Sequence, residues 1–209
     1  MWLLMLACAP VARLVVPDPM YTSDGQMLEG PRRWREGDVA EVGEWQLRLH
    51  DVTPVQVTRD AQAGEELKHT ESAWKLDVVR GGNTLLVECR EQAAVRLTRI
   101  SDTLVLPSDQ QHRLHCRLGA DAELLLFGAS LKDGRGYIRS GQRRFLLEPL
   151  RQMVDGELVD GFLLRESGRP VAAVEGGAGV WPPKDGDLGL TAGLFALVSA
   201  AGLAERRTE

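Results

Sequence analysis

Apolar and polar residues alternate one by one along most of the chain. Trp45, Leu47 and Leu49 alternate with polar neighbours, and a similar pattern begins at Trp74. A period of two is typical of strands that bury one face. Further strands are expected at 84–90, 95–100, 103–106, 112–118, 122–127, 134–140, 143–150, 159–165 and 170–175, and 61–72 reads as a loop or edge hairpin. The pattern predicts a mainly β domain, an antiparallel barrel or sandwich of about ten to twelve strands.

The last part of the chain has a different pattern. Leu188 to Ala204 contains no charged residue, and Pro182 and Pro183 precede it. Wound as a helix capped by Asp185 or Asp187, it would carry apolar or small side chains on every side. Such a helix is either enclosed by protein or inserted in a membrane. Its length is near the lower limit for a span, so we expect one apolar C-terminal helix, 188–204, buried against the sheet.

The region before the first clear strand is rich in proline, glycine and charged residues and shows little periodicity. We therefore divide the chain into a signal-peptide remnant with its cysteine (1–8), a tether or lead-in (9–43) and one β-rich domain (44–209).

The extreme N-terminus carries an apolar run that ends in a cysteine. Its sequence is Met1-Trp2-Leu3-Leu4-Met5-Leu6-Ala7-Cys8-Ala9-Pro10. This run resembles the lipobox of bacterial lipoprotein signal peptides. The resemblance implies cleavage before Cys8, acylation of its thiol and attachment to a membrane of the bacterial cell envelope. Ala9 offers no inner-membrane retention signal, which favours the outer membrane. Because no Lys or Arg precedes the run, we expect an upstream start codon. The alternative is a cytoplasmic protein with Cys8 in its core.

Cys89 and Cys116 both fall in expected strands. If Cys8 is lipidated, two thiols remain, and an exported compartment allows them to form a disulfide. On the chain-entropy model this bond would stabilise the fold by about 3–4 kcal/mol. The alternative is a pair of free core cysteines in a cytosolic domain.

A series of antiparallel strands followed by one apolar helix resembles the tubby C-terminal-like group, which includes the phospholipid scramblases and LURP-one-related proteins. The similar part runs from Trp45 to Arg206, and its most suggestive stretch is the expected hairpin Gly161-Phe162-Leu163-Leu164-Arg165-Glu166-Ser167-Gly168-Arg169-Pro170-Val171-Ala172-Ala173-Val174. The resemblance implies a barrel of about twelve strands around the C-terminal helix, and no functional residue can be matched.

The sequence shows no recognisable active site. His112, His115 and Cys116 could each bind a metal, but on one strand His115 points away from the other two. Gly176-Gly177-Ala178-Gly179 lacks the Lys-Ser/Thr of a phosphate loop. We therefore predict no catalytic residue, no metal and no cofactor. A net charge of −5 without a long basic block also argues against nucleic acid as a partner.

The sequence therefore predicts a non-catalytic envelope lipoprotein, attached to a membrane through Cys8, whose β domain is structural or binds an unidentified protein or lipid partner. The second hypothesis is a cytosolic tubby-like module that binds lipid or a small apolar ligand. The third is an unrecognised hydrolase, because two carboxylates can converge from remote strands.

Overall fold

The computed structural model describes Leu14, Val16 and residues 28–29, 34–62, 65–101, 104–176, 179–183 and 185–206. These residues form thirteen strands and one helix. The strands are β1 (Leu28–Glu29), β2 (Val39–Val42), β3 (Trp45–His50), β4 (Gln56–Gln62), β5 (Glu65–Arg80), β6 (Asn83–Arg99), β7 (Val105–Leu118), β8 (Ala122–Gly128), β9 (Arg135–Ser140), β10 (Arg143–Val154), β11 (Glu157–Glu166), β12 (Arg169–Glu175) and β13 (Gly179–Trp181), and the helix is α1 (Leu188–Arg206).

All thirteen described strands belong to one antiparallel sheet in the order β1-β13-β12-β11-β10-β9-β8-β7-β6-β5-β3-β2. Strand β4 pairs with one half of β5, and β3 pairs with the other half. The two ends of this order approach each other, since a side chain at Gly43, in the β2–β3 turn, would meet Leu28 Cδ2 of β1 at 3.0 Å. The sheet is thus a nearly closed barrel, which confirms the predicted fold class and settles barrel over sandwich.

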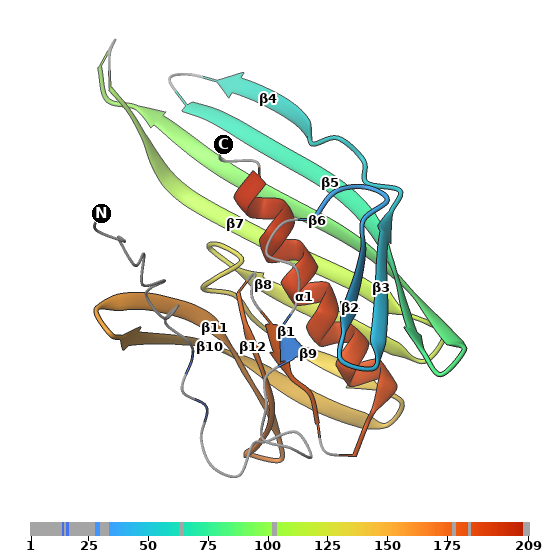
Figure 1. Ribbon diagram of the computed structural model, residues 1–209. Coiled ribbons are helices and arrows are strands. Elements are labelled where there is room, and N and C mark those ends of the chain that lie inside the picture. Colours follow the sequence, from blue (N-terminus) through green and yellow to red (C-terminus); the bar gives the residue numbers. More distant parts are fainter. Residues whose placement is uncertain are drawn as a thin grey trace, which may run out of the picture.

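Helix α1 runs through the inside of this barrel (Figure 1). All residues from Gly189 to Ala200 are buried, and the ring of Phe195 lies edge-on to Trp45 with centroids 5.8 Å apart. Small residues allow close approach: a Cβ on Gly193 would lie 2.6 Å from Ile138 Cδ1 of β9. The prediction of a buried C-terminal helix is confirmed, and the helix extends two residues beyond the predicted end. No helix among the described residues is long and apolar enough to cross a membrane.

The helix begins at an ionic cluster that ties it to the barrel wall. Asp187 caps it, because its Oδ1 accepts the Leu190 backbone N–H at 2.8 Å. The Arg143 guanidinium donates to Asp187 at 3.1 Å and to both carboxylate oxygens of Glu166 at 2.8 Å. The two hydrogen bonds from Arg143 to Glu166 hold the pKa of Glu166 below its usual value, and desolvation offsets this effect only in part. Of the two predicted capping residues, Asp187 therefore takes the role.

Part of the predicted lead-in, 9–43, belongs to the folded domain. The strands Leu28–Glu29 and Val39–Val42 lie in this range, and Trp34 between them is fully buried. Earlier still, Leu14 and Val16 cover the outer face of β11–β13, and the Leu14 N–H donates to the buried Glu175 carboxylate at 2.8 Å. The tether interpretation is wrong for these residues, because a two-residue strand and single anchor side chains leave no periodicity in the sequence.

Candidate binding surface on the outer face of the barrel

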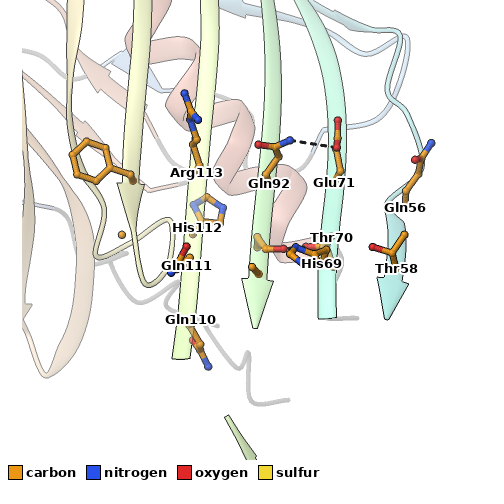
Figure 2. A pocket seen from close by; sticks show the side chains of 14 residues that line it. Gln56, Thr58, His69, Thr70, Glu71, Gln92, Gln110, Gln111, His112 and Arg113 are labelled. Carbon is orange, nitrogen blue, oxygen red and sulfur yellow. Dashed lines mark hydrogen bonds between the residues drawn. The ribbon is translucent and has the colours of Figure 1, made fainter. Parts of the chain in front are cut away.

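Strands β4 to β8 carry an open hollow of about 680 Å³ on their outer face. Figure 2 shows this face, with the helix behind the strands. The lining residues are polar for the most part: Gln56, Thr58, His69, Thr70, Glu71, Gln92, Ala93, Ala94, Gln110, Gln111, His112, Arg113, Phe127 and Gly128.

The strand register explains how residues so far apart in the sequence meet. Gln56, Glu71, Gln92, Arg113 and Phe127 lie directly opposite one another on β4, β5, β6, β7 and β8. Residues paired in this way project from the same face of a sheet. They form one row across five strands, and their neighbours along each strand point to the barrel interior.

A second row lies two residues further along each strand. It contains Thr58, His69, Ala94 and Gln111, again in direct register. The residues between the rows, Thr70, Ala93, His112 and Gly128, point inward, as does Gln110 beyond the second row, so only their backbones can line the outer hollow. The hollow is therefore a trough between two rows of mostly polar side chains.

The chemistry of the trough is mostly that of neutral hydrogen-bonding groups. Glu71 is already engaged, since its carboxylate lies 3.3 Å from the Arg90 guanidinium and accepts the Gln92 amide at 3.3 Å. Arg113 forms no ion pair with any described residue. Phe127 is 55% exposed and offers a ring face at the end of the first row. Amide groups, one available cation and one exposed ring suit a polar ligand that also has apolar faces.

A separate polar cluster lies inside the barrel behind the trough. Glu91 of β6 lies between two partners: Ser72 donates to its Oε2 at 3.3 Å, and His112 Nε2 lies 2.8 Å from its Oε1. A serine nucleophile needs an imidazole as its base, with the carboxylate on the far side of the ring. Here the serine bonds to the carboxylate, and all three residues are almost fully buried. The arrangement does not match that of a hydrolytic triad.

Cys89 and Cys116 lie directly opposite each other on β6 and β7 and form a disulfide. Their Cα atoms are 4.1 Å apart, and both side chains are buried inside the barrel. The predicted pairing is therefore present. Cys116 is bonded to Cys89 and His112 contacts Glu91, so the three metal-competent residues His112, His115 and Cys116 do not converge on one point. Within the described ranges no three His, Cys, Asp or Glu side chains group as metal ligands.

The proposed lipidation residue, Cys8, lies outside the described residues. No known protein family matches the chain, and no curated protein or solved structure matches it either. Membership of the tubby C-terminal-like group therefore stays a prediction. The barrel around a C-terminal helix is the architecture that this resemblance implies.

Proposed function

We propose that this chain is an exported lipoprotein of the bacterial envelope, held to a membrane through Cys8, whose barrel binds a ligand on its outer face and catalyses no reaction. The observation that carries the proposal is the buried Cys89–Cys116 disulfide. Structural disulfides persist in oxidising compartments and are rare in the cytosol. The chain has three cysteines, so this bond leaves Cys8 as the one thiol for acylation.

The outer face is the place for a ligand because the inside of the barrel is occupied. Helix α1 fills the interior with buried side chains such as Leu194 and Phe195. A small apolar ligand in the interior would have to displace them, which disfavours that part of the tubby-like hypothesis. The trough across β4 to β8 is open and already lined by hydrogen-bonding side chains.

An oligosaccharide is the ligand class that fits the trough best. Sugar hydroxyls and acetamido groups can bond to the amides of Gln92 and Gln111, and the C–H face of a sugar ring can stack on Phe127. Arg113 can pair with one carboxylate on such a ligand.

Acylation is tested by expressing the gene with its natural upstream sequence in a bacterial host and supplying a labelled palmitate analogue. We expect the label on the mature protein. The Cys8→Ser variant should lose the label, and the matched control Cys89→Ala/Cys116→Ala should keep it. A mature chain that keeps residues 1–7 and an unmodified Cys8 thiol would overturn the lipoprotein proposal.

Ligand binding is tested by calorimetric titration of the Cys8→Ser chain with N-acetylglucosamine tetramers. We expect saturable binding that Phe127→Ala weakens about tenfold, because the stacked ring is lost. Leu146→Ala is the matched control, since Leu146 is a similarly exposed apolar residue on β10, away from the trough. Absence of saturable binding, or equal weakening by both substitutions, contradicts the oligosaccharide assignment.

A further inference from the structure

The outer-face row that begins at Gln56 continues past Phe127 onto a sixth strand. Phe127 of β8 lies directly opposite Arg135 of β9, and on its other side it lies opposite Arg113 of β7. Paired residues project from the same face of a sheet, so the exposed ring stands between two arginine side chains. Both arginines are exposed, and neither forms an ion pair with any described residue. Their backbones are two strand spacings apart, about 10 Å.

The carboxylates around this segment already have arginine partners. They form three pairs: Glu71–Arg90 at 3.3 Å, Asp133–Arg151 at 2.7 Å and Glu148–Arg165 at 2.9 Å. Asp109 also lies on β7, but it is four residues from Arg113, a distance of about 13 Å, and directly opposite Arg96 of β6. The net charge of −5 on the whole chain is screened over about 8 Å at physiological ionic strength, so the local charges decide. Among the described residues, the surface around Phe127 therefore carries two uncompensated positive charges.

The β8–β9 hairpin holds the ring and the Arg135 side chain in a fixed relation. A Cβ on Gly136 would lie 1.8 Å from the Leu125 carbonyl oxygen, so only glycine allows the two strands to approach this closely. The turn is closed by Ser130, whose hydroxyl donates to the Asp133 carboxylate at 2.7 Å. A ligand therefore meets a preformed backbone and loses less free energy to ordering when it binds.

We propose that the ligand of the trough is an acidic oligosaccharide, with one sugar ring on Phe127 and carboxylates of the flanking units on Arg113 and Arg135. A guanidinium group binds a carboxylate through two parallel hydrogen bonds, and an exposed aromatic ring gives the sugar an apolar surface. The inference rests on the ligand binding proposed above and specifies the charge of that ligand. It does not depend on acylation of Cys8.

The test is calorimetric titration of the Cys8→Ser chain with tetragalacturonate and with its methyl ester, which keeps the sugar skeleton and lacks the charge. Tetragalacturonate should bind about tenfold more tightly, because charge-assisted hydrogen bonds are stronger than neutral ones. Arg135→Gln should lower this affinity ratio about fivefold, and raising the ionic strength from about 0.05 M to about 0.5 M should also lower it. The matched control is Arg48→Gln, which should keep the ratio, since Arg48 is an exposed arginine on β3 without an ion pair to any described residue.

Several results would overturn the inference. Equal affinity for tetragalacturonate and its ester removes the acidic ligand and leaves the proposed ligand binding intact. A preference for the acid that survives Arg135→Gln places the charged contact elsewhere. If poly-L-glutamate binds as tightly as tetragalacturonate, with the same loss in Arg135→Gln, the site selects charge without a sugar and the ligand class is wrong. If neither form of the tetramer binds and N-acetylglucosamine tetramers do not bind either, the ligand-binding function itself fails, and this inference with it.

Discussion

The Cys89–Cys116 disulfide makes a quantitative prediction about stability. Its removal by Cys89→Ala/Cys116→Ala frees the denatured chain from a loop whose ends are 27 residues apart. On the chain-entropy model that constraint contributes about 3.5 kcal/mol. For 209 residues the entropy of unfolding near the midpoint is about 440 cal/mol/K, so the double variant should melt about 8 °C lower.

The assay is urea unfolding followed by tryptophan fluorescence, with buried Trp34 and Trp74 as reporters. The oxidised parent, the dithiothreitol-reduced parent and the double variant are compared. The two chains without the bond should agree within about 1 kcal/mol and be less stable than the oxidised parent. Their denaturant slopes should be steeper than that of the oxidised parent, because the denatured chain without the bond is less compact. Equal stability of all three would refute the reasoning, because the bond would then impose no net constraint on the unfolded state.

Three further predictions concern the helix and its attachment to the barrel wall. Phe195→Ala should lower the free energy of unfolding by about 3–5 kcal/mol, because it opens a cavity where the chain cannot relax fully. Gly193→Val should lower the free energy of unfolding by at least about 1–3 kcal/mol, since even the added Cβ would clash with Ile138. Urea unfolding measures the effect of both substitutions. Arg143→Met should remove part of the acid dependence of stability, measured by thermal melts from pH 3 to pH 7, because Arg143 lowers the pKa of Glu166 in the folded state.

The direction of the pH effect follows from linkage. A carboxylate whose pKa is lower in the folded chain contributes stability above its unfolded value, here 4.5, and that contribution is lost as the pH falls through the lower folded value. The parent should therefore lose more stability between pH 5 and pH 3 than Arg143→Met. Identical acid profiles would contradict the role assigned to Arg143, and wild-type stability of Phe195→Ala would contradict an enclosed helix.

The fold could be predicted largely because most of its strands bury one face. Trp45, Leu47 and Leu49 alternate with exposed neighbours in β3, as the sequence pattern requires. The helix was equally predictable, because a helix that is apolar on every side is stable only when protein encloses it or when it lies in a membrane. Two predicted strands, 103–106 and 112–118, form the single strand β7, whose pairing with β6 shifts register between Arg96 and Leu97. The intervening residues are exposed, so the pattern that marks a strand is missing there.

The trough was not predictable from the sequence. Gln56 and Phe127 are 71 positions apart and share a row because four successive strand pairings align them. The signal in the sequence is weak: alternate positions carry glutamine, threonine, histidine or arginine, as on any solvated strand face. Which of these positions become neighbours depends on register, and a shift by one residue would turn them to the other face.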